Sequence, residues 1–212
     1  MIVSKIIKPR SKALTAAIVM IVIIAATVFV TTVVRAFFYA PEDGSVLPSF
    51  FGAPPPVAYM PSDPVRLIIP ALSIDAKVQY TGLNSKGSMG VPTNFTDVAW
   101  YKNGTVPGKL GSAVIDGHVD NGLGLAGVFK HLGDLKDGDD VYVVTKDGSK
   151  LHFVVKDTEM YPYTDAPAAQ IFIAHDKAHL NLITCAGTWV RGERTYNERL
   201  VVYTTYIDTV AS

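Results

Sequence analysis

The longest apolar stretch of the chain covers residues 13–34 and contains no charged residue. With a rise of about 1.5 Å per residue, a helix of this length crosses a hydrocarbon core about 30 Å thick. The stretch exceeds the apolar part of a secretory signal, which has about 7–15 residues, and no persuasive small-x-small cleavage site follows it. The pattern therefore predicts a transmembrane anchor over residues 13–40, with a cleaved signal peptide as the alternative.

Beyond residue 65, short apolar runs alternate with Gly, Pro, Asn and Asp, which is typical of strands joined by turns. Residues 146–149 contain Asp-Gly between two such runs and predict a hairpin. Helical patterns are short, near residues 128–132 and 166–171. We therefore expect a mostly-β fold, a closed or nearly closed β-barrel. The clearest strand candidates are residues 66–69, 112–115, 141–144, 151–155, 180–184 and 200–204.

The segment between these two parts, residues 41–64, is rich in proline, with seven of the 13 prolines of the chain. Such a composition favours an extended, semi-rigid linker. The predicted organisation is a basic tail over residues 1–12, the anchor over residues 13–40, the linker over residues 41–64 and a barrel domain over residues 65–212.

Charge is distributed unevenly along a chain that is neutral overall, with 19 basic and 19 acidic residues. Five basic residues and no acidic ones precede Ala36, so the remainder carries a net charge of −5. Four of those five precede the apolar stretch, which predicts a cytoplasmic N-terminus by the positive-inside bias. We expect a single-pass protein of the cell membrane with an extracellular domain. A mildly acidic domain argues against nucleic acid as a partner.

Candidate chemistry centres on Cys185, the single cysteine of the chain, which closes an apolar run. His118 directly follows another run after Gly117, and Arg199 begins a third. A free thiol has a pKa of about 8.5, so a nucleophilic cysteine needs a base beside it. A guanidinium stays charged and suits the oxyanion of acyl transfer. The three residue types together predict thiol-based acyl transfer.

Each of these residues also has a simpler interpretation. A lone cysteine at a strand end is more often a small buried hydrophobe. His118 alone suits a hydrogen-bonded histidine at a strand end, and Arg199 alone suits the protection of an edge strand. Arg191 and Arg194 compete for the cationic role, and we favour Arg199 because a strand start fixes its direction.

Several other polar residues lie near this chemistry in the sequence. Asp116 and Asp120 flank His118 and are candidates to orient its imidazole. His175 and His179 have a spacing of four that is compatible with zinc. They fall in what reads as a loop without a suitably placed glutamate, so an exposed loop is the favoured interpretation and no metal or other cofactor is expected.

These motifs resemble the sortases, cysteine transpeptidases of Gram-positive-type cell envelopes. The similarity rests on Gly117-His118, on residues 182–185 (Leu-Ile-Thr-Cys) and on residues 199–203 (Arg-Leu-Val-Val-Tyr), and it extends back to Ile69-Pro70. Among subfamilies the chain is most similar to class F, given residues 117–120 and 185–189.

The resemblance implies an eight-stranded β-barrel that cleaves a Leu-Pro-x-Thr-Gly-like sorting signal of surface proteins between Thr and Gly. Cys185 would form a thioester, His118 would exchange protons with the two amines, and Arg199 would hold the oxyanion. Thr184 would help to line the substrate site. The acceptor would be an amine of a peptidoglycan precursor or of a pilin.

Two further implications concern the segments around the site. Subsites for the signal's leucine and proline are expected near residues 160–172. In pilin-assembling sortases the inhibitory lid contains an Asp-Pro pair that is followed by an aromatic residue. Here Val65 follows Asp63-Pro64, so the end of the linker is favoured and a lid is the minority interpretation.

Other functions stay open at this point. A pilin-polymerising sortase would use the same residues with a different acceptor. Papain-like and cell-wall amidase families place the cysteine before the histidine, the reverse of the order here, and an L,D-transpeptidase has its arginine where this chain has Gly187. A non-catalytic barrel that binds envelope peptides would need no thiol.

Overall fold

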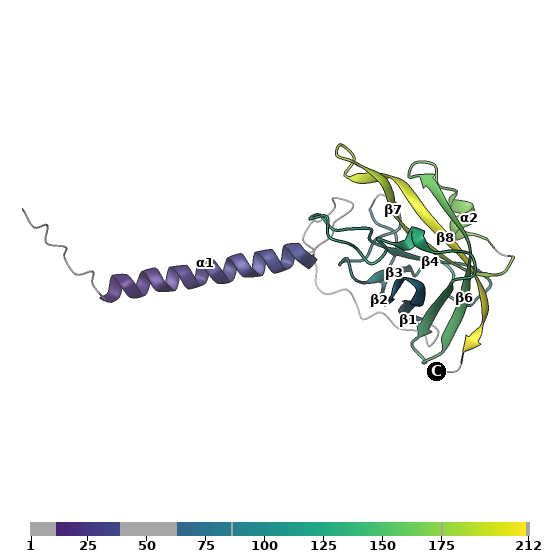
Figure 1. Ribbon diagram of the computed structural model, residues 1–212, viewed down its shortest axis with the longest axis horizontal. Helices are drawn as coiled ribbons and strands as arrows, with labels where there is room; N and C mark the ends of the chain where they lie inside the picture. Colours follow the sequence, from purple (N-terminus) through teal and green to yellow (C-terminus); the bar gives the residue numbers. More distant parts are fainter. Residues whose placement is uncertain (1–11, 39–62, 86, 175, 211–212) are drawn as a thin grey trace, which may run out of the picture. The chain divides into compact units, whose positions relative to one another are not determined.

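The computed structural model describes residues 12–38, 63–85, 87–174 and 176–210, which form two separate units. The first unit is a single helix, α1 (Lys12–Phe38), drawn in purple in Figure 1. Its segment Ala16–Val34 has a mean hydropathy of 2.8 and is long and apolar enough to cross a membrane, as an anchor or a signal segment would. The predicted span 13–40 and this helix largely coincide.

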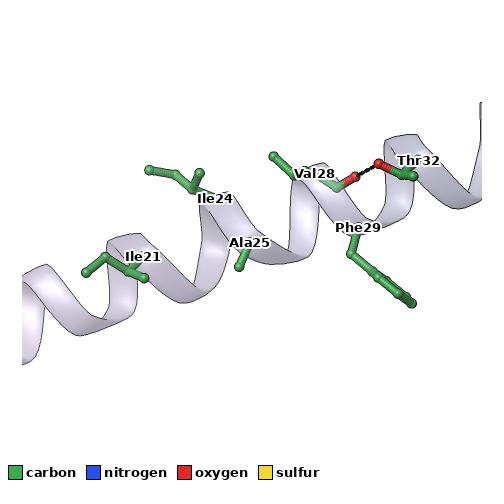
Figure 2. A pocket seen from close by; sticks show the side chains of 6 residues that line it. All are labelled: Ile21, Ile24, Ala25, Val28, Phe29 and Thr32. Carbon is green, nitrogen blue, oxygen red and sulfur yellow. Dashed lines mark hydrogen bonds between the residues drawn. The ribbon is translucent and has the colours of Figure 1, made fainter.

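Thr27, Thr31 and Thr32 of α1 keep their hydroxyls hydrogen-bonded within the helix. Figure 2 shows Thr32 donating to the carbonyl of Val28, at 2.8 Å. Thr27 donates in the same way to Ile23, at 2.8 Å. Such bonds to the preceding turn satisfy a hydroxyl where no water is present. The polar residues of the stretch are therefore compatible with a lipid environment.

The second unit is an eight-stranded closed barrel, which confirms the predicted fold (Figure 1). Its strands are joined in the order β1-β2-β3-β4-β7-β8-β6-β5, and β5 pairs with β1 to close it. The pairs β2–β3 and β4–β7 are parallel, and the others are antiparallel. The strands are β1 (Pro64–Ile69), β2 (Ile74–Thr81), β3 (Val98–Tyr101), β4 (Gly111–Gly117), β5 (Asp140–Thr145), β6 (Lys150–Pro162), β7 (Ala178–Val190) and β8 (Thr195–Val210).

Three short helices lie between the strands: η1 (Pro70–Leu72), η2 (Leu132–Asp134) and α2 (Ala168–Phe172). The predicted helical segment 166–171 appears as α2, whereas the segment 128–132 consists of turns and shares only Leu132 with η2. The strand candidates omitted β2 and β3. Strand β1 begins at Pro64, one residue before the predicted start of the barrel domain at Val65, and Pro64 pairs with Thr145 of β5. Pro64 is therefore the first residue of the barrel sheet, and residues 39–62, which make up most of the predicted linker, lie outside the described part.

The barrel has an inner core and a second apolar cluster on its outer face. Inward side chains such as Leu182, Leu200 and Val202 fill the barrel. On the opposite face of β4 and β8, Val114 and Val201 pack with Ile171 of α2. Because strand residues alternate between faces, neighbours such as Leu200 and Val201 serve different clusters. This alternation determines which side of the barrel each site residue faces.

The predicted Asp-Gly hairpin joins β5 to β6. The Gly148 backbone N–H donates to Thr145 at 2.9 Å, and Gly148 adopts a positive φ of 87°. Asp147 accepts hydrogen bonds from the Thr145 hydroxyl, at 2.5 Å, and from the Ser149 N–H, at 3.1 Å. These bonds, the one from Thr145 first, lower the pKa of Asp147 below its usual value. The turn is thus held by both its backbone and its carboxylate.

We expect Gly148→Ala to lower the free energy of unfolding by about 1–2 kcal/mol, the cost of a left-handed conformation for a residue with a Cβ. A Cβ at Gly148 would touch nothing within 4 Å, so backbone strain is the cause. The measurement is urea unfolding of the full chain in detergent, followed by the fluorescence of the tryptophans, of which Trp100 lies in the core.

Gly192→Ala is the matched control, in the β7–β8 turn. A Cβ there also has open space and the residue has no positive φ. Equal effects of the two substitutions would contradict the strain argument.

Candidate active site

The site is built where β4 ends beside its parallel neighbour β7, which continues past Cys185 to Val190. Their register runs from Gly111 opposite Ala178 to Asp116 opposite Ile183. One position further, the Thr184 hydroxyl donates to the carbonyl of Gly117 at 2.7 Å, and Thr184 is buried. Because His118 and Cys185 are the next residues on the two chains, this hydrogen bond holds their backbones side by side.

His118 is fully buried and its backbone and ring are both held. Its carbonyl accepts a hydrogen bond from the Phe129 N–H at 2.9 Å. A Cβ at Gly127 would lie 2.2 Å from that carbonyl oxygen, so the returning chain needs a glycine there. The ring nitrogen Nε2 lies 2.8 Å from the carbonyl oxygen of Pro92. Because a carbonyl only accepts, this contact assigns a proton to Nε2, which leaves Nδ1 as the nitrogen without a proton in the neutral ring.

Cys185 is 4% exposed and lines a cleft of about 400 Å³ at the end of the barrel. Val119, the residue after His118, lines the same cleft. The thiol is therefore shielded from bulk water but bordered by a space that a small group can occupy.

Arg199 lies directly opposite Cys185 in the antiparallel pair β7–β8. Opposite residues of such a pair project their side chains to the same face, about 5 Å apart at Cβ. This is the outer face, because Leu200, the next residue, belongs to the inner core. The two predicted groups are thus neighbours on the outer surface of the barrel.

The guanidinium of Arg199 is oriented by its own strand. Nη1 donates to the carbonyls of Tyr196 and Glu198, at 3.0 and 2.9 Å, and Nη2 donates to the Thr195 hydroxyl at 2.9 Å. These bonds use three of its five N–H groups. The carbon of the guanidinium also lies 5.6 Å from the ring centre of Tyr163, which follows β6.

The competing arginines occupy different surroundings. Arg191 and Arg194 lie in the exposed turn between β7 and β8, and Arg194 has a positive φ of 55°. Of the three, Arg199 alone stands opposite Cys185 in the strand register.

Tyr196 links the segments that carry the site and was not predicted from the sequence. Its hydroxyl donates to the carboxylate of Asp120, two residues after His118, while its carbonyl accepts from Arg199. Its ring packs edge-to-face on Trp189, with centres 5.3 Å apart. Asp120 therefore contacts Tyr196, while the ring of His118 contacts the Pro92 carbonyl. The residues of the His118–Pro92 contact are 26 positions apart in the chain, and those of the Tyr196–Asp120 contact are 76 apart. Contacts between such distant residues leave no local signal in the sequence.

The outer face beyond Arg199 is a surface of aromatic side chains under α2. Asn181 of β7 donates to the carbonyl of Ile171 at 2.6 Å, which fixes α2 against the barrel (Figure 1). The hydroxyls of Tyr161 and Tyr203 lie 3.1 Å apart. Burial, and then this hydrogen bond, raise the pKa of Tyr203 far above its usual value, so its hydroxyl stays neutral.

The histidine pair with zinc-like spacing is only partly described. His179 lies in β7 rather than in a loop, and its Nε2 donates to Asp176 at 2.8 Å, which lowers the pKa of that carboxyl. His175 lies outside the described residues. Within the described ranges, no group of three or more His, Cys, Asp or Glu side chains has a metal-binding arrangement.

A family model for the sortase domain matches residues 67–207, which includes all three predicted site residues. The chain belongs to the sortase family. Sortases are cysteine transpeptidases, so the protein is an enzyme of that type. A search of curated proteins found no match.

Solved sortase structures share the fold at low sequence identity. Sortase C1 of pilus island 1 from group B Streptococcus matches with 19% identity and a TM-score of 0.53, over 69% of this chain and 66% of that one. Sortase A from Corynebacterium diphtheriae, a lid mutant, matches with 22% identity and a TM-score of 0.54, over 68% and 71%. Sortase C-1 from Actinomyces oris matches with 24% identity and a TM-score of 0.51, over 69% and 75%.

We expect Thr184→Val to lower the free energy of unfolding by about 1–3 kcal/mol, because the substitution removes the donor and leaves the buried Gly117 carbonyl without that bond. Urea unfolding of the full sortase in detergent measures the loss. Thr184→Ser retains the hydroxyl, and we expect it to recover most of the stability. Equal losses in both variants would show that the methyl group and not the hydrogen bond is responsible.

Proposed function

We propose that this sortase is a membrane-anchored transpeptidase that cleaves a Leu-Pro-x-Thr-Gly-like sorting signal between Thr and Gly. It transfers the new acyl group to an amine of the cell wall, and class F is the subfamily that its motifs resemble most. The main support is the register that sets Cys185 opposite Arg199, together with the bond from Thr184 to Gly117 that brings His118 beside them.

In the first half-reaction, the Cys185 thiolate attacks the threonine carbonyl carbon and forms a tetrahedral intermediate. The carbon–nitrogen bond then breaks, the glycine amine leaves with a proton from His118, and a thioester remains. Proton transfer through Nδ1 of His118 agrees with the contact of Nε2 to Pro92.

In the second half-reaction, the acceptor amine attacks the thioester carbonyl. His118 removes the extra proton from the nitrogen as the carbon–sulfur bond breaks, which forms an amide and returns the thiolate. Water attacking in place of the amine would give hydrolysis. The choice between the two depends on how well an amine is held near Cys185.

Arg199 stabilises the oxyanion in both half-reactions. An oxyanion donor must be fixed before charge develops, and the guanidinium is held by three acceptors of residues 195–198. Its remaining N–H groups are suited to the substrate carbonyl. Thr184 donates its hydroxyl proton to Gly117, so its proposed part in the substrate site falls to its backbone.

The donor peptide occupies the outer face between Arg199 and α2. This surface offers the half-buried side chains of Tyr163 and Phe172, which lie within the segment 160–172 that we expected to contact the leucine and proline of the signal. The proposed localisation, anchored by α1 with the N-terminus in the cytoplasm and the barrel outside, agrees with surface proteins as donors. Candidate acceptors are amines of peptidoglycan precursors or of pilins.

We expect Arg199→Ala to lower kcat for peptide cleavage about 10²- to 10³-fold, the loss typical of one oxyanion donor. The measurement is steady-state cleavage of a Leu-Pro-x-Thr-Gly peptide by the full chain in detergent, with the best member of a peptide library as donor. Arg191→Ala is the matched control and should stay within about two-fold, because Arg191 lies in the exposed turn. A larger loss in the Arg191 variant would assign the cationic role to the turn.

Thioester formation gives a second test. We expect the intact protein to gain the mass of the peptide up to its threonine when donor is present and amine is absent. Cys185→Ala should gain no mass. An adduct in this variant, or continued peptide release by it, would exclude the proposed nucleophile, and peptide binding without turnover by the unmodified chain would indicate a binding barrel.

A further inference from the structure

Two segments border each other at one end of the barrel: the β3–β4 turn over residues 102–110, and the described residues of the segment 173–177, which precedes β7. They are joined at both ends. Tyr101, just before the turn, packs its ring edge-to-face on Phe172, with centres 5.7 Å apart. Gly111, just after the turn, donates its N–H to the carbonyl of the last residue before β7, at 2.9 Å. We call these two segments together the turn surface.

The turn surface combines apolar and cationic side chains that are open to solvent. Leu110 is 68% exposed and Ile173 is 57% exposed. Lys102, Lys109 and Lys177 are exposed as well, and none of them forms a salt bridge within the described part of the chain. Its ammonium groups are therefore open to a partner outside the molecule.

The charge of the turn surface is positive, although the domain as a whole is acidic. Residues 102–110 contain two lysines and no acidic residue. In the segment 173–177 the acidic residue is Asp176, whose carboxylate accepts a hydrogen bond from His179 at 2.8 Å. Three lysines and one aspartate give the turn surface a charge of +2, whereas residues 36–212 together carry −5. The surface is thus a local cationic patch.

The chain enters the barrel at this same end. Strand β1 begins at Pro64, whose carbonyl accepts a hydrogen bond from the Tyr80 hydroxyl at 2.6 Å. The next residue of β2, Thr81, accepts at its carbonyl from the N–H of Lys102, where the turn surface starts, at 2.9 Å. The start of the barrel and the turn surface are therefore joined through the last residues of β2.

We propose that the turn surface docks on a membrane with anionic headgroups, with its lysines on the phosphates and with Leu110 and Ile173 in the interface. Apolar area and electrostatic attraction to anionic lipids together determine such interfacial binding. The inference rests on the proposed localisation, in which α1 anchors the chain. The 25 residues between Phe38 and Pro64 then keep the barrel within about 90 Å of the bilayer. Because the tether makes docking intramolecular, a weak contact suffices.

A lipid surface suits these residues better than a second copy of the chain. A symmetric dimer through the turn surface would bring the same patch of each copy together. Lys109 and Lys177 would then face lysines of the other copy, and like charges opposed in an interface are costly. Anionic headgroups complement these charges and accept the neighbouring apolar side chains.

Docking at this end directs the catalytic residues away from the lipid. Cys185 lies seven positions after the start of β7, about 23 Å of strand. The β7–β8 hairpin lies further along the barrel (Figure 1). The thiol is thereby held at a set height above the bilayer, which favours donors whose sorting signal emerges at that height.

The test uses Leu110→Trp in the full chain, reconstituted into vesicles whose acyl chains are brominated near the headgroup. The vesicles contain phosphatidylglycerol and phosphatidylcholine in equal parts, or phosphatidylcholine alone. Bromine quenches a tryptophan that enters the interface, and the unmodified chain gives the background of Trp100 and Trp189. Leu123→Trp is the matched control, because Leu123 is 57% exposed in the loop after His118, at the other end of the barrel.

We expect the fluorescence added by Leu110→Trp to be quenched in the vesicles with phosphatidylglycerol and not in phosphatidylcholine alone, and that of the control in neither. Adding Lys109→Gln and Lys177→Gln should remove the quenching. Adding Lys130→Gln and Lys136→Gln, which change two exposed lysines away from the turn surface, should leave it. In 1 M salt the quenching should also be lost, because the Debye length falls to about 3 Å.

Hydrogen exchange of the unmodified chain gives the same test without a substitution. We expect residues 102–110 to exchange more slowly with phosphatidylglycerol vesicles than with phosphatidylcholine vesicles, and residues 121–125 to exchange equally in both. Equal exchange of residues 102–110, or quenching of Leu110→Trp that is absent or does not depend on anionic lipid, would overturn the proposal. So would protection that rises with protein concentration in detergent without vesicles, which would identify a second copy as the occupant.

Failure of the proposed function has different signatures. If the full chain does not float with the vesicles, the proposed anchoring is wrong and the docking with it. If the chain floats but cleaves no donor peptide, the proposed reaction is wrong, and the quenching and exchange measurements still decide the docking.

Discussion

Six consecutive register pairs join β4 to β7, and the bond from Thr184 to Gly117 continues that association to the last residues before His118 and Cys185. Parallel neighbours cannot be joined by a tight turn, so the imidazole and the thiol come from segments far apart in the chain. Both ends of the hydrogen bond are shielded from water, where an unmade bond is costly. The relative position of the two groups therefore depends on the barrel as a whole.

Successive strand residues face alternately into and out of the barrel, so a residue of the core and a residue of the site can be direct neighbours in the chain. Thr184 and Leu200 face inward and join the pairing and the core, while Cys185 and Arg199, their immediate neighbours, face outward. A shift of the β7–β8 register by one residue would exchange these faces. The closed barrel resists such a shift because inward residues such as Leu182 and Val202 are fully buried. Core packing thus fixes the geometry of the site.

Much of this arrangement was accessible from the sequence. The apolar runs predicted six of the eight strands and the place of His118 directly after β4. Strands β7 and β8 extend beyond those runs, so Cys185 and Arg199 lie within their strands and not at the strand ends that we expected. The sequence could not reveal β3, because its four residues form too short a pattern. Neither could it reveal the Pro92 carbonyl that contacts His118, since any residue supplies a carbonyl and only the folded chain selects one.

The contacts of Tyr196 explain how a site on three strands can keep a common geometry. Through its hydroxyl it binds Asp120, on the segment that continues from His118, and through its carbonyl it binds the guanidinium of Arg199. A displacement of the β7–β8 hairpin would therefore move the segment of Asp120 and the guanidinium of Arg199 together. Fixed donors stabilise an oxyanion without reorganising when charge develops. Arg191 and Arg194 lie in the exposed turn, so binding an oxyanion there would first have to order a long side chain. The loss of side-chain conformational entropy opposes this use. The position of Arg199 within a paired strand favours the oxyanion role on the same physical ground.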